Sequence, residues 1–144
     1  LYTLLEALGL AEESMTVEVI PHVPRAMGLG GSSALAVAVI RALDHAFRLG
    51  LDDATVNAHA YECEKFAHGT PSGIDNTIAT YGMPLLFQRG AGLDSTADLP
   101  ARPPRIEELI LGAPLPLVIG ITGRESLTAN TVARVRHIRD AHPA

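Results

Sequence analysis

A cluster of three glycines, Gly28, Gly30 and Gly31, is followed by a stretch from Ser32 to Leu49 that contains no proline or glycine. This stretch is rich in Ala, Val, Leu and Ile and is long enough for a buried helix that Gly50 closes. Glycines before a helix leave a backbone that can turn tightly and approach a ligand without a Cβ in the way. The pattern therefore predicts a glycine-rich turn that leads into a central helix.

The start of this helix is suited to bind a phosphate group. Its first N–H groups have no partner within the helix, and the helix dipole adds partial positive charge. The hydroxyls of Ser32 and Ser33 can hold a phosphate oxygen or a metal ion. The alternative is a plain glycine-rich turn with Ser32 as an ordinary N-cap. Two phosphate-loop patterns do not fit, since no lysine follows the glycines as in GxxxxGK[ST], and GxGxxG lacks its third glycine.

The second chemical feature is the string from Glu62 to Asn76, ECEKFAHGTPSGIDN. Glu64 and His68 are four residues apart and share a face near the end of an expected helix, where a carboxylate can bind Mg²⁺. Residues 71–73 (PSG) form a rigid turn, and Asp75 follows where a short helix begins. A carboxylate at such a place is well situated to accept a proton from a substrate hydroxyl.

Each of these residues also has a purely structural interpretation. Glu64 can be a solvated helix residue that pairs with its charged neighbours, and Asp75 can be a plain helix cap. A zinc site formed by His59, Cys63 and His68 has tolerable spacing, but it lacks a CxxC or HExxH core. Zinc is therefore not favoured.

Composition excludes several classes of function. Eleven Lys and Arg against sixteen Asp and Glu give a net charge of −5, which excludes a general nucleic-acid binder because such affinity comes mostly from basic side chains. Ten of the eleven basic residues are arginine, and Lys65 is the only lysine. No apolar run approaches the roughly 20 residues needed to cross a bilayer. A single cysteine gives no internal disulfide, so we expect a cytoplasmic protein without nucleic-acid or membrane partners.

The rest of the chain predicts a mixture of helices and strands. Asp52 or Asp53 is expected to cap a helix from 54 to 67 with Val56, Ala60, Cys63 and Ala67 on one face. The other expected elements are, in chain order, a helix within 1–9, a strand at 15–20, a short helix from Asp75, a strand at 83–88, a linker at 90–104, a strand at 115–122 and a helix at 126–140.

The segment PRAMGLGGSSAL, followed further along the chain by EKFAHGTPSGIDN, resembles the GHMP small-molecule kinases and, within that superfamily, the mevalonate kinases. The glycine-serine loop alone indicates the superfamily, whereas the second string is much more specific. The resemblance implies a two-domain α+β fold. Residues 1–104 would be part of an N-terminal, ATP-binding domain with a left-handed βαβ crossover, ending in a linker, and residues 105–144 would start a ferredoxin-like C-terminal domain.

The resemblance also implies roles for the matched residues. Ser33 and Glu64 match the family's Mg²⁺ ligands, and Asp75 matches the aspartate proposed as catalytic base for the mevalonate hydroxyl. The residues that match the ATP phosphate loop are Gly28, Leu29, Gly30, Gly31, Ser32, Ser33 and Ala34. The residues that the resemblance places near the phosphates or the substrate are His68, Ser72 and, by a looser match, Thr122.

The activity implied is ATP-dependent phosphorylation of the primary hydroxyl of mevalonate to 5-phosphomevalonate, in isoprenoid precursor synthesis, with ATP and Mg²⁺ bound at the site. The alternatives are a GHMP kinase acting on phosphomevalonate, homoserine or a sugar, and a non-catalytic nucleotide sensor. Retention of Glu64 and Asp75 argues against the sensor, because binding alone needs no base. A homodimer is left open. We expect this chain to be the central part of a longer family chain, with the family's catalytic lysine, which Lys65 does not match, outside it.

Overall fold

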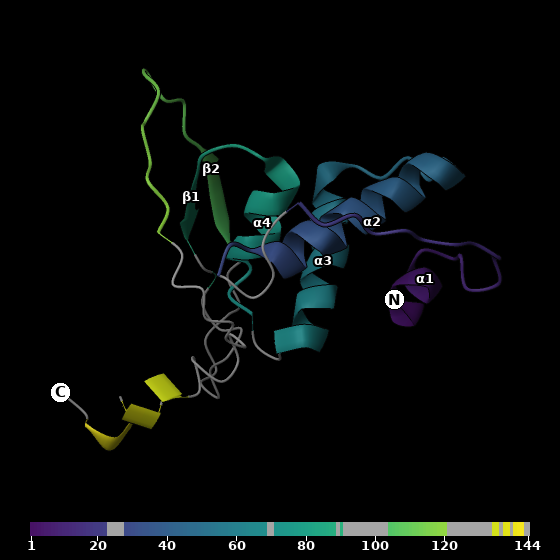
Figure 1. Ribbon diagram of the computed structural model, residues 1–144, viewed down its shortest axis with the longest axis horizontal. Helices are drawn as coiled ribbons and strands as arrows, with labels where there is room; N and C mark the ends of the chain where they lie inside the picture. Colours follow the sequence, from purple (N-terminus) through teal and green to yellow (C-terminus); the bar gives the residue numbers. More distant parts are fainter. Residues whose placement is uncertain are drawn as a thin grey trace.

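The computed structural model describes residues 1–22, 28–68, 71–88, 90, 104–120, 134–135, 137–138 and 140–142, without the side chains of 67 and 68. The elements are α1 (Tyr2–Ala7), α2 (Gly31–Phe47), α3 (Asp53–His68), α4 (Ile74–Tyr81), β1 (Leu85–Gln88) and β2 (Arg105–Glu108). Helices α2, α3 and α4 pack together, with the two strands on one side and α1 on the other (Figure 1). These helices and the antiparallel pair of strands confirm the predicted α+β class for the described residues.

The central helix begins where the glycine cluster predicts but ends earlier than expected. Gly30 is its N-cap, and Arg48 is its C-cap with a left-handed φ of 55°. Asp44 explains the early end, because its carbonyl accepts the amides of Arg48 and Leu49 and its Oδ1 accepts the Leu51 amide at 3.1 Å. Arg48 therefore closes α2 in place of Gly50.

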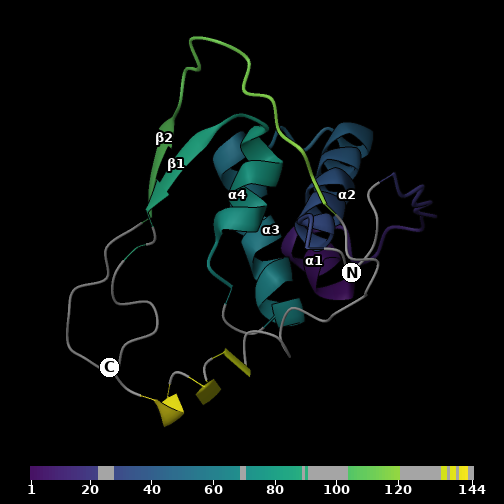
Figure 2. The same cartoon turned by 60° about the vertical axis from the view of Figure 1, so that its left-hand side comes forward.

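The apolar core lies between α1, α2 and α3. On α2 the buried residues recur at helical spacing, and after a short loop α3 runs back across α2 (Figure 2). The buried apolar residues are Leu4, Leu10, Val37, Ile40, Leu43, Val56 and Ala60. Ser33 and Glu64 extend the same two buried helix faces by one turn, so the core becomes polar toward the N-terminus of α2.

The sheet has two antiparallel strands, β1 and β2. Leu85 pairs with Glu108 and Phe87 with Ile106. The strand predicted at 83–88 is confirmed over Leu85–Gln88, whereas β2 was not predicted because its sequence, RIEE, has too little apolar alternation. β2 lies just beyond the predicted linker, and the domain boundary at 104 stays a prediction.

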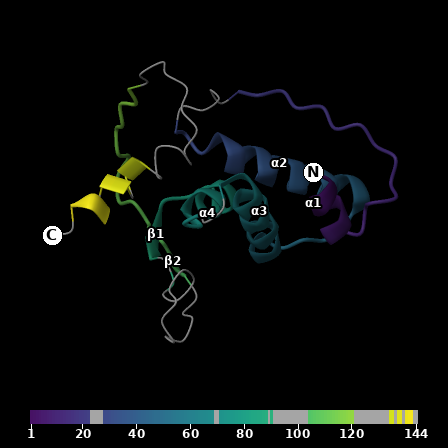
Figure 3. The same ribbon diagram turned by 90° about the horizontal axis from the view of Figure 1, so that it is seen from below.

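Two other predicted strands are wrong within the residues that the structure describes. Residues 15–20 and 115–120 form no strand, and Val118 is fully exposed. Figure 3 shows the first of these segments in the long arc that joins α1 to α2. Their patterns favour an extended chain, but a strand also needs a neighbour to bond its N–H and C=O groups, and no described strand lies beside either segment.

The C-terminal predictions are only partly within the described residues. Residues 134–135, 137–138 and 140–141 are helical, as expected for the helix at 126–140, whereas its start lies outside the description. The left-handed crossover and the ferredoxin-like domain stay predictions. In the described part of the chain, no helix is long and apolar enough to span a membrane.

We expect Ile40→Ala to lower the free energy of unfolding by about 2–5 kcal/mol, because Ile40 is fully buried on α2 and its loss leaves a cavity. Urea denaturation followed by circular dichroism measures the change. Leu35→Ala on the same helix is the matched control, since Leu35 is 45% exposed and should change stability by less than about 1 kcal/mol. Equal losses would contradict the assignment of the core face.

The N-terminus of α3 predicts a pH effect. Asp52 is the cap, and the Thr55 amide donates to its Oδ1 at 2.8 Å. Hydrogen bonds from the Thr55 side chain and then its amide lower the pKa of the Asp52 carboxyl in the folded state. Its contribution to stability is therefore present above the ordinary aspartate pKa and lost as pH falls through the lowered value. We expect the difference in Tm between the original chain and Asp52→Asn to shrink with acidification; a constant difference contradicts this assignment.

Candidate functional site

The first part of the site is the exposed backbone at the N-terminus of α2. Gly28 and Gly30 have left-handed φ values of 73° and 66°, which favour glycine. The N-cap position of α2 is occupied by Gly30, and Ser32 lies inside the first helical turn. The interpretation of Ser32 as an ordinary N-cap is therefore wrong. The first turn of α2 also contains no acidic residue. The partial positive charge at this helix end is therefore not offset by a carboxylate of its own turn.

Two polar side chains, one near the start of α2 and one near the end of α3, are buried. Ser33 is 0% exposed, and among the described residues its Oγ has no hydrogen-bond partner. Glu64 is only 4% exposed, so the interpretation of Glu64 as a solvated helix residue is wrong. Burying a hydroxyl without a hydrogen-bond partner is unfavourable, and an oxygen-binding cation is one partner that the Ser33 Oγ could take.

The helix packing brings these two residues to the same end of the core. Ser33 lies one turn before Val37 on the buried face of α2, and Glu64 lies one turn after Ala60 on the buried face of α3. A Cβ on Gly73 would lie 3.6 Å from the Tyr61 ring of α3, and a Cβ on Gly30 would lie 3.9 Å from Asp75 Oδ1, so the C-terminal half of α3 lies on the side of the glycine turn. We infer that Ser33 and Glu64 face one region of the site.

Asp75 approaches the glycine turn from α4. A Cβ built on Gly30 would lie 3.9 Å from Asp75 Oδ1, so the carboxylate is directly beside the N-cap of α2. The N-cap of α4 is Gly73, with φ 87°, and Asp75 is an exposed residue of the first helical turn. Asp75 is therefore not a plain helix cap, and its carboxylate is accessible next to the proposed phosphate-binding backbone.

A hydrogen-bond network joins α3 to the two residues that follow Asp75 on α4. Asn76 Nδ2 donates to Asn57 Oδ1 at 2.6 Å, and Thr77 Oγ1 donates to the Gly73 carbonyl at 2.6 Å. Asn57 Nδ2 donates to Thr77 Oγ1 at 3.4 Å. We gave these residues no role from sequence. An asparagine beside the apolar face of a predicted helix was the available signal, because asparagine seldom favours a helix interior.

The turn before α4 is also held by packing. An added Cβ at Gly73 would lie 3.6 Å from both the Tyr61 ring and the Phe87 ring, which places α3 and β1 against this turn. Ser72 Oγ accepts the Ile74 amide at 3.3 Å, so this side chain stabilises the turn itself. Ser72 lies two residues before the start of α4, in the turn that the motif predicts. Its side chain is exposed.

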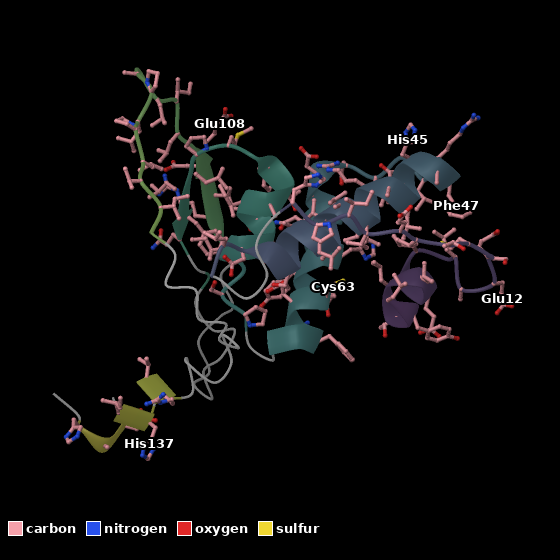
Figure 4. The ribbon with its side chains drawn as sticks, viewed as in Figure 1. Glu12, His45, Phe47, Cys63, Glu108 and His137 are labelled. Carbon is pink, nitrogen blue, oxygen red and sulfur yellow. The ribbon has the colours of Figure 1, made fainter. Side chains whose placement is uncertain are left out.

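Lys65 and Cys63 have ordinary structural surroundings. Lys65 Nζ donates to Glu62 Oε1 at 2.7 Å on its own helix, a bond that raises the pKa of the lysine. Burial raises the pKa of the Cys63 thiol, which disfavours the thiolate that zinc needs. Among the described residues no group of three His, Cys, Asp or Glu side chains could hold a metal, and the labelled Cys63, His45 and His137 lie on separate elements (Figure 4).

The structure does not describe every predicted site residue. His68 ends α3, but its side chain is outside the description, as is Thr122. Of the predicted residues that the structure describes, Gly30 and Asp75 are brought into proximity, and Ser33 and Glu64 are buried. An exposed helix N-terminus, two buried oxygen donors and an adjacent carboxylate can together bind a metal-associated phosphate and take up a proton.

Comparison with known proteins finds relatives that are named as kinases. The chain is 34% identical over 125 residues to a mevalonate kinase of Thermococcus sibiricus, covering 87% of this chain and 33% of the relative. It is 31% identical over 134 residues to a mevalonate kinase of Gibberella zeae, covering 84% of this chain and 25% of the relative. The chain thus spans about a third or less of the length of these curated relatives. No solved structure matches it significantly.

The family comparison covers the residues that build the site. The family model for the GHMP kinases N terminal domain matches residues 1–83, more than half of the chain. This range contains the glycine turn, Ser33, Glu64 and Asp75. The chain therefore belongs to the GHMP kinase family, and residues 1–83 carry the family's N-terminal domain.

Proposed function

We propose that the intact protein carrying this sequence transfers the γ-phosphoryl group of ATP to the primary hydroxyl of mevalonate, giving 5-phosphomevalonate and ADP. The observation that carries the proposal is the position of Asp75 Oδ1, 3.9 Å from where a Cβ of Gly30 would lie. A carboxylate beside a phosphate-binding backbone is the arrangement that phosphoryl transfer to an alcohol needs. The similarity to mevalonate kinases supports mevalonate as the acceptor.

The phosphates of ATP are assigned to the N-terminus of α2. Gly28 and Gly30 allow close approach of the backbone, and the amide groups and dipole at the start of α2 would attract the anion. The residues of this proposed loop are Gly28, Leu29, Gly30, Gly31, Ser32, Ser33 and Ala34. Positioning and charge neutralisation are the main demands of this chemistry, and both come from the helix end.

The residues present fit a magnesium ion. Mg²⁺ binds few protein oxygens and keeps its other positions for water and phosphate. The buried Ser33 hydroxyl, which has no hydrogen-bond partner among the described residues, and the buried Glu64 carboxylate are a suitable oxygen pair. We assign the ion to these two residues, where it would neutralise charge on the phosphates during transfer.

Asp75 is assigned as the base. The acceptor hydroxyl oxygen forms a bond to the γ-phosphorus while the bond from that phosphorus to the β,γ-bridging oxygen breaks, and the electron pair leaves with ADP. The hydroxyl proton passes to the Asp75 carboxylate and then to solvent. Asp75 is exposed, so its carboxylate can contact a bound alcohol.

The proposal extends to residues and properties that follow from the family resemblance. His68, Ser72 and Thr122 are assigned to the surroundings of the phosphates and the acceptor. Residues 1–104 are assigned to the N-terminal domain and its linker, and residues 105–144 to the start of the C-terminal domain. We also propose a cytoplasmic location.

A coupled assay of ADP release by the intact protein tests the function. The acceptors are mevalonate, phosphomevalonate, homoserine and galactose, each with ATP and Mg²⁺. We expect the highest kcat/KM with mevalonate. A higher value with another alcohol shifts the assignment to a related kinase. ATP binding without ADP release in the presence of any acceptor favours a nucleotide sensor.

A further inference from the structure

Three hydrogen bonds tie the first turn of α4 to Asn57 of α3. Asn57 accepts from Asn76 Nδ2 through Oδ1 at 2.6 Å and through its carbonyl at 3.4 Å. Through Nδ2 it donates to Thr77 Oγ1 at 3.4 Å, and this hydroxyl in turn donates to the Gly73 carbonyl at 2.6 Å. Both residues that Asn57 tethers, Asn76 and Thr77, directly follow Asp75 along the chain.

Burial makes this network a strong constraint. Asn76 is 3% exposed and Thr77 is 2% exposed, so water cannot readily replace Asn57 as their partner. Among the described residues, Asn76 Oδ1 has no hydrogen-bond partner, so Asn57 alone orients the Asn76 amide there. Loss of the Asn57 side chain would remove the 2.6 Å partner of the Asn76 amide and would leave the Thr77 hydroxyl with its bond to the Gly73 carbonyl but without its tie to α3.

The network sets the rotation of α4 about its axis. Asn76 and Thr77 face α3, whereas Asp75, one residue earlier, is exposed and approaches Gly30 at the N-terminus of α2. A side-chain end lies about 5–6 Å from a helix axis, so a rotation of about 10° moves the carboxylate by about 1 Å. A displacement of about 1 Å at a reacting group can lower a rate by about 100-fold.

We propose that Asn57 is a positioning residue, which through Asn76 and Thr77 fixes the rotation of α4 and so holds the Asp75 carboxylate beside the phosphate-binding turn. The consequence for catalysis rests on the proposed function. The orientation of α4 itself does not, because it follows from hydrogen bonds and burial alone.

The test uses Asn57→Ala and the pair Thr77→Val and Thr77→Ser in the intact protein. Thr77→Val keeps the shape but removes the hydroxyl, whereas Thr77→Ser keeps it. The matched control is Arg41→Gln. Arg41 donates to Asp53 Oδ1 at 2.6 Å and to the Thr80 carbonyl at 3.4 Å, so it also ties α4 to its neighbours, but at the opposite end from Asp75. The Tm of each variant records its loss of stability.

We expect kcat to fall by about 10- to 100-fold in Asn57→Ala and Thr77→Val, with KM for ATP changed by less than about threefold. Thr77→Ser should retain most of kcat. Arg41→Gln should keep kcat within about twofold even if its Tm falls by as much as the Tm of Asn57→Ala. Unchanged kcat in Asn57→Ala and Thr77→Val overturns the proposal. So does an equal fall of kcat in Arg41→Gln.

Hydrogen exchange gives a readout that does not depend on activity. The Thr77 amide donates to the Gly73 carbonyl at 3.4 Å, and it should exchange at least about 10-fold faster in Asn57→Ala than in the original protein or in Arg41→Gln. Unchanged exchange overturns the positioning role. If the original protein phosphorylates none of the four alcohols, the proposed function fails, and the exchange result still decides whether Asn57 positions α4.

Discussion

Asp75→Asn is expected to lower kcat by about 10²- to 10⁴-fold, the range by which a general base accelerates proton transfer. Asparagine keeps the size of the side chain and its place beside Gly30 but cannot take up the hydroxyl proton. The affinity for ATP should change by less than about twofold, because the phosphate-binding backbone belongs to α2. Single-turnover ADP release and nucleotide titration measure the two quantities.

Asp53→Asn is the matched control for this variant. Asp53 is an acidic residue in the first turn of α3, as Asp75 is in the first turn of α4, and it contacts Arg41 on the surface. The same chemical change there should keep kcat within about twofold, since surface substitutions have small effects. Full activity of Asp75→Asn removes Asp75 as the base.

Glu64→Gln is expected to raise the Mg²⁺ concentration needed for half-maximal activity by at least about 10-fold, since even outer-shell partners of a metal site change its affinity by that much. The substitution keeps the shape of a side chain that is 4% exposed and removes its charge. Excess Mg²⁺ should restore part of the activity. The measurement is a Mg²⁺ titration of ADP release at a fixed ATP concentration.

Two further variants separate a metal role from a structural one. Glu62→Gln changes an exposed carboxylate two residues earlier on α3, which pairs with Lys65, and should leave the Mg²⁺ requirement unchanged. Ser33→Ala removes a buried hydroxyl that has no hydrogen-bond partner in the described part of the chain, so it should raise the Mg²⁺ requirement without lowering Tm. An unchanged requirement in both Glu64→Gln and Ser33→Ala contradicts the assignment of the ion.

Local sequence signals predicted the helices and much of the site, and they failed where pairing between distant segments decides the structure. The glycine cluster, the Asp52 cap and the start of the helix near Asp75 depend on neighbouring residues, so short patterns identify them. The segment at 15–20 has a strand pattern but no strand beside it in the described ranges, and β2 has a neighbour but a weak pattern. A strand is defined by its partner, which periodicity does not reveal.

In the candidate site, too, the sequence predicted the residues but not the contacts between distant segments. The motif predicted Ser33, Glu64 and Asp75, but the burial of Ser33 and Glu64 and the approach of Asp75 to Gly30 come from the way α3 and α4 pack on α2. The contribution of Asn57 could not be predicted because its partners, Asn76 and Thr77, lie on another helix. Tertiary hydrogen bonds of this kind leave little trace in one sequence.

The shortness of α4 has a consequence for how heat inactivates the protein. With eight residues, α4 is below the length at which a helix is stable by itself, so it exists because α2, α3 and β1 hold it. Elements of low intrinsic stability open before the whole fold does. Because the proposed base lies on this helix, catalytic competence should be lost reversibly at a temperature below that of cooperative unfolding, while the apolar core around Ile40 is still intact.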